Sequence, residues 1–290
     1  MDIIAKNWKD YECIDAGEGE KIDRWKDIFL RRPDPTAIWP KTEGIDDWDK
    51  AHGHYHRSSK GGGSWDFKRK IPEDWTIDYQ DLTFKVSPTG FKHTGIFPEQ
   101  SANWDYMRDK IKNSKSEVKI LNLFGYTGGA TMACSAAGAS EVVHVDASKG
   151  MVNWAKENMF LSHLEDNKIR FIVDDVNKFV DREIRRGNHY HGIIMDPPSY
   201  GRGPNSEIWQ IEELLYTLVE KTASLLDDEP LFMIINSYTT GFSLLALENI
   251  MKLTLLKRFP DGKVVTGSIG LPITNRDIVL PCGIYGRFER

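Results

Sequence analysis

The sequence predicts an α/β fold in which a doubly wound, mostly parallel sheet with a closing antiparallel hairpin follows a small β-rich domain. Three observations support this prediction. From about residue 117, short apolar runs alternate with longer helical segments, which is typical of a parallel sheet covered on both faces. The last two apolar runs are separated only by a loop, so they fit an antiparallel pair. Residues 1–90 are polar and rich in Trp, with turn residues throughout.

Composition narrows the class of protein. The chain has 290 residues, of which 40% are hydrophobic, and this is enough for a buried core in one large or two smaller domains. The net charge of −5 disfavours a general nucleic-acid coat but allows a local RNA-binding patch. The three Cys are far apart, so we expect no disulfide framework and a reducing, cytoplasmic location. The N-terminus lacks the apolar region of a signal peptide, and no apolar run approaches the length of a membrane span.

The domain predicted at 1–90 contains short alternating runs at 75–79 and 82–86, which indicate half-buried antiparallel strands. The Gly-rich segment 60–64 is predicted to be a loop.

The domain predicted at 91–290 holds the alternating elements. Apolar runs indicate its strands, and apolar residues at helical spacing indicate its helices. The expected strands are 118–124, 141–146, 169–173, 192–196 and 231–236, followed by the hairpin 263–268 and 277–288. The expected helices are 129–137, 148–161, 176–186, 207–226 and 242–256.

The first motif is the Gly-rich turn 121–129, where an apolar strand runs into Gly125, Gly128 and Gly129 and then a helix of small residues. Glycines let the backbone approach a ligand closely, and a helix start offers N–H groups. The spacing G-x-x-G-G differs from the G-x-G-x-x-G of dinucleotide folds. The alternative is a simple strand–helix turn.

Acidic residues follow the next two strands. Asp146 lies 21 positions after Gly125, where a carboxylate can accept hydrogen bonds from both ribose hydroxyls of an adenosine cofactor. Asp174 and Asp175 follow the strand after that, where a carboxylate can meet the adenine amino group. In both places the alternative is a cap on the following helix, which for Asp146 would begin near Ser148.

The last motif, residues 196–201, begins with Asp196, Pro197 and Pro198 directly after an apolar strand. Two prolines stiffen the loop and remove two N–H donors. We therefore expect a rigid loop whose carbonyls stay free to face a substrate.

Together these residues resemble class I S-adenosylmethionine-dependent methyltransferases over about 91–290. The chain resembles in particular the bacterial large-subunit ribosomal RNA methyltransferases that modify cytosine carbon-5 or guanine nitrogen-7. The finer resemblance lies in residues 92–100, 122–129, 196–198 and the ending 270–288. It implies a Rossmann-like sheet and S-adenosylmethionine as cofactor.

The resemblance also implies roles for individual residues. Phe97 and Gln100 would lie across the cofactor, and Asp196 with Pro197 would frame the transfer site. The implied cofactor-binding residues are Phe97, Gln100, Phe124, Gly125, Tyr126, Thr127, Gly128, Asp146, Ala147, Ser148, Asn158, Asp174, Asp175 and Asp196. The implied catalytic residues are Asp196, Pro197, Ser199 and Tyr200.

One departure concerns the chemistry. Enzymes that methylate cytosine carbon-5 add a Cys thiolate to the ring first. The two places expected to carry that Cys read Pro198-Ser199 and Asn236-Ser237. Cys134 and Cys282 lie elsewhere, in positions typical of packing thiols. We therefore expect direct displacement, with a guanine ring nitrogen as the fitting acceptor.

A second segment carries His52, His54 and His56, followed by aromatic and basic residues up to Lys70. The alternating His would face one way in a strand, but no carboxylate or Cys completes a metal-ligand set nearby, so we expect no metal. The aromatic and basic residues suit stacking on unpaired bases. A solvated hairpin with an apolar inner face is the alternative.

The sequence therefore predicts a methyltransferase acting on a base of RNA, first of all ribosomal RNA, with no membrane contact. The alternatives are a methyltransferase for a protein or small molecule, an assembly factor that binds the cofactor without catalysis, and a nicotinamide-dependent oxidoreductase. The missing G-x-G-x-x-G disfavours the last of these.

Overall fold

The computed structural model describes residues 1–58, 62–90, 92–202 and 207–290. These residues divide into two compact units. The larger unit comprises Met1–Ile3, Asn103–Ile269 and Gly283–Arg290, and the smaller unit comprises Ile4–Ala102 and Gly270–Cys282. The predicted functional boundary at residue 90 is a different division of the chain and stays a prediction.

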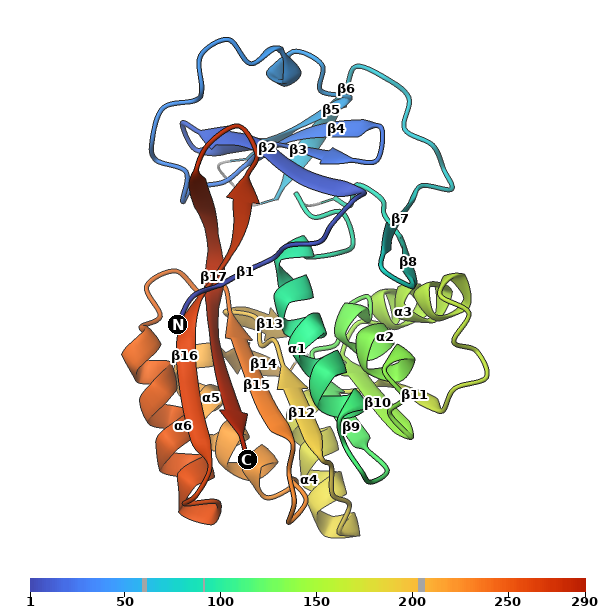
Figure 1. Cartoon of the computed structure of the whole chain (residues 1–290), viewed down its shortest axis with the longest axis vertical. Coiled ribbons are helices and arrows are strands. Elements are labelled where there is room, and N and C mark those ends of the chain that lie inside the picture. Colours follow the sequence, from blue (N-terminus) through green and yellow to red (C-terminus); the bar gives the residue numbers. More distant parts are fainter. Residues whose placement is uncertain (59–61, 91, 203–206) are drawn as a thin grey trace. The chain divides into compact units, whose positions relative to one another are not determined.

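The larger unit is built on a sheet in the order β11-β10-β9-β12-β15-β17-β16 (Figure 1). The strands β9 to β12 and β15 run parallel, and β17 pairs with β15 in the antiparallel sense. The strands are β9 Lys119–Leu123, β10 Glu141–Asp146, β11 Ile169–Val173, β12 Gly192–Met195, β15 Phe232–Ser237, β16 Lys263–Ile273 and β17 Ile278–Glu289. The helices are α1 Ser101–Lys112, α2 Gly129–Ala136, α3 Lys149–Leu161, α4 Val176–Arg186, α5 Ile211–Ala223 and α6 Leu244–Arg258.

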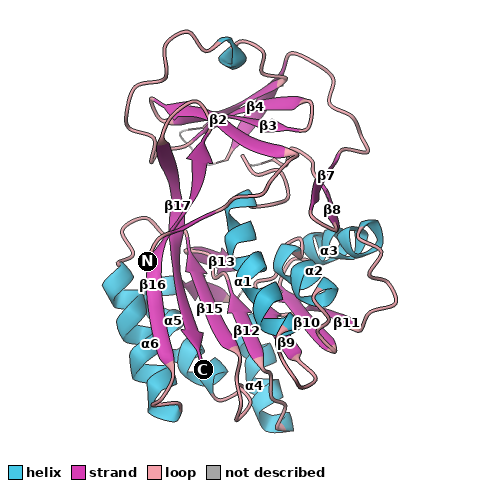
Figure 2. Ribbon diagram, viewed as in Figure 1, coloured by secondary structure: helices cyan, strands magenta, loops and turns pink. Residues whose placement is uncertain are grey.

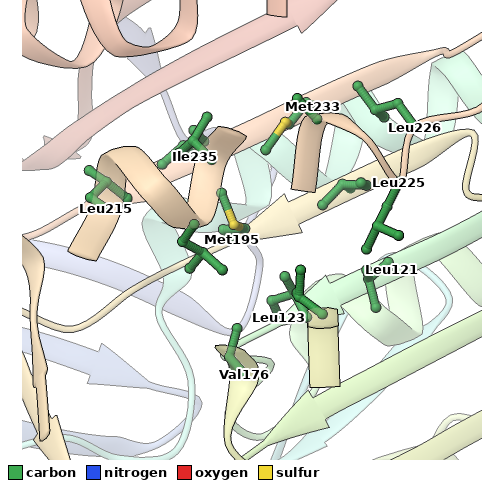
Figure 3. Packing of buried hydrophobic residues seen from close by; sticks show 14 of the residues in the cluster. Leu121, Leu123, Val176, Met195, Leu215, Leu225, Leu226, Met233 and Ile235 are labelled. Atoms are coloured by element: carbon green, nitrogen blue, oxygen red, sulfur yellow. The ribbon is translucent and has the colours of Figure 1, made fainter. Parts of the chain in front are cut away.

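Strand alternation sorts the apolar side chains onto the two faces of this sheet. Leu121, Leu123, Met195, Met233 and Ile235 point to one face, where they form a buried cluster with α4, α5 and α6 (Figure 3). Helices α1, α2 and α3 cover the other face (Figure 2). The predicted doubly wound sheet with its closing hairpin is therefore confirmed.

In the smaller unit the strands pair in the order β2 Tyr11–Gly17, β3 Glu20–Trp25, β4 Ile28–Pro33, β5 Gly53–Arg57 and β6 Gly63–Phe67. Residues 270–273, the end of β16, lie beside β2, where Ile273 pairs with Cys13. The remaining strands in the described residues are β1 Ile3–Ile4, β7 Thr76–Tyr79, β8 Leu82–Lys85, β13 Tyr200–Arg202 and β14 Ile208–Gln210. The predicted antiparallel pair at 75–79 and 82–86 is confirmed by β7 and β8.

Two local expectations differ from the structure, and one helix was not predicted. Helix α5 begins at Ile211 and not at 207, because residues 208–210 form β14, which pairs with β13. Helix α1 has no counterpart among the predicted elements. Of the predicted loop 60–64, Gly63 and Ser64 belong to β6, and residues 60 and 61 lie outside the described part of the chain.

Candidate functional site

The Gly-rich turn leaves β9 at the point where the sheet order reverses, between β9 and β12. In open α/β sheets, ligands bind outside the carboxyl ends of the strands at this point. The turn is tight: Phe124, Tyr126 and Gly128 adopt the left-handed backbone conformation, with φ angles of 57°, 51° and 86°. Gly128 caps α2, so the first N–H groups of this helix have no partner within it and face the turn.

Gly125 has a steric reason to lack a side chain. A Cβ at this position would lie 2.4 Å from Cε1 of His144, which is fully buried on β10. Asn122 Nδ2 donates to Thr131 Oγ1 over 2.9 Å, and Thr131 Oγ1 shares a hydrogen bond of 2.9 Å with His144 Nδ1. Burial lowers the pKa of His144 to about 4, so its imidazole is neutral at pH 7. His144 was not predicted from the sequence, although a His within an apolar strand beside a Gly turn is a usable signal.

Asp146 ties two parts of this edge together. Its carboxylate accepts the N–H of Tyr126 over 2.9 Å and the N–H of Ser148 over 2.8 Å. Burial raises its pKa above the usual aspartate value, although these two hydrogen bonds act against the shift. The cap of α3 is Ser148, whose Oγ accepts the N–H of Met151, so the cap alternative for Asp146 is wrong. Ala147 joins the two residues, and each carboxylate oxygen keeps acceptor capacity for a hydroxyl.

Asn158 supports the turn from α3. Its Nδ2 donates to the carbonyl of Thr127 over 2.8 Å, and both residues are buried. Because Asn158 is fully buried, its observed role is to hold the turn in place.

Asp174 and Asp175 lie beside Asp146, since the N–H of Asp174 donates to the Asp146 carbonyl over 3.1 Å. Asp175 caps α4 by accepting the N–H of Lys178 over 3.0 Å, and the carboxylate of Asp174 pairs with Arg182. The cap alternative therefore holds for Asp175, while contact with adenine stays a prediction.

Asp196 follows β12 directly, and its N–H donates to the Leu123 carbonyl over 3.4 Å. This hydrogen bond brings the start of the second loop beside the start of the Gly-rich turn. Pro197 is buried, whereas Ser199 and Tyr200 are exposed. The loop that starts at Asp196 thus carries an acid, a hydroxyl and a phenol at this edge of the sheet.

The loop after Asp196 is anchored by hydrogen bonds that the sequence did not predict. Trp209 Nε1 donates to the Pro198 carbonyl over 2.6 Å, and the N–H of Ile211 donates to the Ser199 carbonyl over 3.1 Å. The expectation that the carbonyls of this loop stay free for a substrate is therefore wrong for these two. Ser199 Oγ also shares a 2.7 Å hydrogen bond with Thr239 Oγ1, which follows β15.

Phe97 and Gln100 belong to the smaller unit. Phe97 caps the short 3-10 helix Pro98–Gln100, and Gln100 is buried. Their predicted position across the cofactor stays a prediction.

The three thiols are unsuited to nucleophilic attack. Burial raises the pKa of Cys13 to about 12 and raises those of Cys134 and Cys282 well above the usual thiol range. The thiolate is the reactive form, so all three sulfurs stay protonated near neutral pH.

A buried polar network at the same edge of the larger unit was not predicted from the sequence. Asn103 on α1 donates through Nδ2 to Asn236 Oδ1 over 2.9 Å, and its Oδ1 accepts from Arg287 Nε and Nη2 over 3.0 and 2.7 Å. This network joins α1, β15 and β17. Asn236 lies near the end of a parallel strand, and that position is a signal which could have been used.

These residues fit an adenosine cofactor with an attached amino acid. The position of Gly125 excludes a Cβ, the turn and the start of α2 supply N–H groups, and the Asp146 carboxylate can accept from ribose hydroxyls.

Comparison with known proteins supports this fit. A sequence profile for S-adenosylmethionine-dependent methyltransferases matches residues 54–257. The crystal structure of the SAM-dependent methyltransferase from Agrobacterium tumefaciens is 32% identical, with a TM-score of 0.94 over 100% of this chain and 93% of that one. A solved structure from Streptococcus mutans, 17% identical with a TM-score of 0.70 over 98% of this chain and 76% of that one, shows the same fold.

Curated relatives include the ribosomal RNA large subunit methyltransferase K/L of Shewanella frigidimarina, 33% identical over 65% of this chain and 25% of that protein. The ribosomal RNA large subunit methyltransferase K of Neisseria meningitidis is 26% identical over 61% of this chain and 49% of that protein. The chain thus spans between a quarter and a half of the length of these two relatives. No helix in the described ranges is long and apolar enough to cross a membrane. The profile match and the fitted cofactor edge place this chain in the family of S-adenosylmethionine-dependent methyltransferases, and S-adenosylmethionine is its cofactor.

Proposed function

We propose that the chain transfers a methyl group from S-adenosylmethionine to a base of ribosomal RNA by direct displacement, without a catalytic Cys. The observation that carries the proposal is the junction of the two loops, where Asp196 donates its N–H to Leu123 beside the Gly-rich turn. The names of the curated relatives support ribosomal RNA as the substrate. A ribosomal RNA substrate in turn implies a cytoplasmic enzyme.

The cofactor supplies an electrophilic methyl group on a sulfonium sulfur. In this proposal, residues 124–128 line its methionine part and Asp146 holds the ribose. Asp175 meets the adenine through the acceptor capacity that its capping bond leaves, and Phe97 and Gln100 are the residues that would lie across the cofactor. Asn158 acts indirectly, by holding the carbonyl of Thr127.

The acceptor base is held by the loop 196–200. Asp196 and Pro197 frame the transfer site, and the exposed Ser199 and Tyr200 orient the base by hydrogen bonding and stacking. A guanine ring nitrogen already carries a lone pair, so alignment with the methyl–sulfur axis is the main requirement. Orientation of this kind can lower a barrier by roughly 7–11 kcal/mol in well-ordered cases. Carbon-5 chemistry would need a thiolate, and the three thiols of this chain are protonated.

The test is radiolabelled methyl transfer to ribosomal RNA isolated from cells that lack the gene, followed by mapping of the modified nucleotide. We expect the Asp196→Ala variant to lose transfer while its circular dichroism spectrum stays native. Arg185→Ala, an exposed substitution on α4, is the control and should transfer normally. Near-normal turnover by Asp196→Ala would contradict the assigned role, and labelling of ribosomal protein in place of RNA would move the substrate to the protein class.

A further inference from the structure

The hairpin of β5 and β6 carries three aromatic rings of graded exposure, which we call the aromatic ladder: Tyr55, Trp65 and Phe67. Strand register pairs Tyr55 with Trp65 and Gly53 with Phe67, so all three rings lie on one face. The rings of Tyr55 and Trp65 are 5.4 Å apart at 68°, and those of Trp65 and Phe67 are 5.6 Å apart and nearly parallel, at 10°. Tyr55 is 4% exposed and Phe67 is 48% exposed. The stack thus runs from the core to the surface.

The outer ring of the ladder is held in place. Its cross-strand neighbour is Gly53, and a Cβ there would lie 2.8 Å from the Phe67 ring, so the ring lies directly over the glycine. Trp65 is fixed in turn, because its Nε1 donates to the Thr89 carbonyl over 2.9 Å. A flat apolar ring that is ordered and half exposed can stack on another flat π-system at little entropic cost.

Four exposed cations adjoin the ladder, and we call them the cationic rim: Arg57, Lys68, Arg69 and Lys70. The backbone of the rim is anchored, since the N–H groups of Lys68 and Arg69 donate to the His52 carbonyl over 2.9 and 3.3 Å. The nearby acid Asp66 lies opposite His54, and strand alternation directs it to the face away from the ladder. The same alternation directs Arg57 to the ladder face, and it directs Lys68, whose N–H donates to the His52 carbonyl, to the face of Asp66. With four cations and one acid at these positions, the hairpin is locally basic in a chain whose net charge is −5.

We propose that the aromatic ladder and the cationic rim bind a single-stranded stretch of the RNA substrate, with an unpaired base stacked on Phe67 and backbone phosphates at the rim. This inference rests on the proposed function and names the form of RNA recognised. Only an unpaired base presents its flat face, because bases inside an A-form duplex are stacked on one another. Three exposed cations directly after Phe67, with Arg57 on the same hairpin, favour a phosphate-bearing chain over a protein segment.

The test measures binding of a short unstructured RNA oligonucleotide, and of the duplex of the same sequence, by fluorescence anisotropy with the full-length protein. The stacking variants are Phe67→Ala and Phe67→Trp, and the rim variant is Lys68→Gln/Arg69→Gln/Lys70→Gln. Matched controls come from the larger unit: Phe160→Ala, which removes a ring that is 59% exposed, and Lys112→Gln/Lys115→Gln/Lys119→Gln, which removes three exposed cations. Calorimetry with S-adenosylmethionine is run on every protein.

We expect Phe67→Ala to weaken binding of the single strand about tenfold, Phe67→Trp to retain it, and the rim variant to weaken it at least as much. Both controls should bind RNA like the wild type, and all variants should bind S-adenosylmethionine normally. The Phe67→Trp and rim variants separate recognition from folding, because neither removes packed volume from the ladder.

Two results would overturn the inference. One is unchanged RNA affinity in both Phe67→Ala and the rim variant, even if these proteins lose binding to whole ribosomal particles, because the surface would then serve a protein. The other is equal affinity for the single strand and the duplex. Failure of the proposed function looks different: a wild-type protein that binds S-adenosylmethionine but neither binds nor methylates RNA would remove the proposed function and this inference together.

Discussion

At the scale of single residues, the contact between Gly125 and His144 makes a sharp prediction. Gly125→Ala places a Cβ against the buried imidazole, so we expect a loss of about 1–3 kcal/mol in the free energy of unfolding and weaker cofactor binding. His144→Ala removes the ring, so the double variant should lose less stability than the sum of the two single variants, by about 0.5 kcal/mol or more. Chemical denaturation of the four proteins measures this coupling.

The matched control is Gly138→Ala. Gly138 has a positive φ of 98°, and no atom lies within 4 Å of the place that a Cβ would take, so the cost of this substitution is backbone strain alone. Its effect should add to that of His144→Ala without coupling. Strict additivity for Gly125→Ala as well would mean that the imidazole does not limit this position.

His144 also makes a prediction about pH. Its pKa in the folded protein is about 4, below the usual histidine value of about 6.5, because burial disfavours the charged form. Between these values the unfolded chain binds more protons than the folded one. The contribution of His144 to the free energy of unfolding is therefore fully present above about pH 6.5 and is lost as pH falls toward 4. Denaturation at pH 7 and pH 5 should show a loss of about 2 kcal/mol from this residue.

The variant that checks this effect is His144→Gln, which should lose less stability between pH 7 and pH 5 than the wild type does. His93 in the smaller unit acts in the same direction, since burial lowers its pKa to about 3. His93→Gln is therefore the comparison, and it should leave the contribution of His144 in place. An unchanged pH response in His144→Gln would show that the imidazole is not held neutral by the fold.

At the scale of elements, regular strand and helix patterns were predictable where local sequence decides them. Strand β10 and helix α4 have the predicted bounds, because an unbroken apolar run and an acid-capped helical segment are local signals. Helix α1 was missed although Trp104, Met107 and Ile111 recur at helical spacing and are buried. The start of α5 was misplaced because residues 208–210, which include the apolar Ile208 and Trp209, fit a strand or a helix equally well, and pairing with β13 decides between them.

The network that joins α1, β15 and β17 gives a prediction at this scale. Asn103→Ala leaves the amide of Asn236 and the guanidinium of Arg287 without their shared partner in a buried site, so we expect a loss of about 2–4 kcal/mol in the free energy of unfolding. The control is Asn113→Ala just beyond α1, where the exposed amide bonds only locally to Asp109. It should change stability by less than about 0.5 kcal/mol. Equal effects from the two substitutions would show that the network does not stabilise the unit.

At the scale of the whole molecule, the sequence predicted which residues share one edge of the sheet but not how the chain is shared between compact units. The acids at the carboxyl ends of β10, β11 and β12 could be placed at one edge because parallel strands end together. The pairing of Ile273 with Cys13 joins positions 260 apart, and no local pattern specifies such a contact. The same limit applies to His144 and Asn103, whose roles depend on partners from distant segments.

The charge of the whole molecule sets the last prediction. A net charge of −5 gives RNA no long-range attraction, so phosphate contacts must be local, and the inference above assigns them to the cationic rim. Each phosphate contact with a single strand contributes about −0.7 to the slope of log affinity against log salt, so four cations predict a slope of about −3. We expect this slope for kcat/KM toward RNA at saturating cofactor, and a slope near −1 for the rim variant, which keeps Arg57. The control variant Lys112→Gln/Lys115→Gln/Lys119→Gln should keep the wild-type slope. A wild-type slope steeper than about −6 would contradict the assignment to the rim, because it would require a much larger phosphate-binding surface.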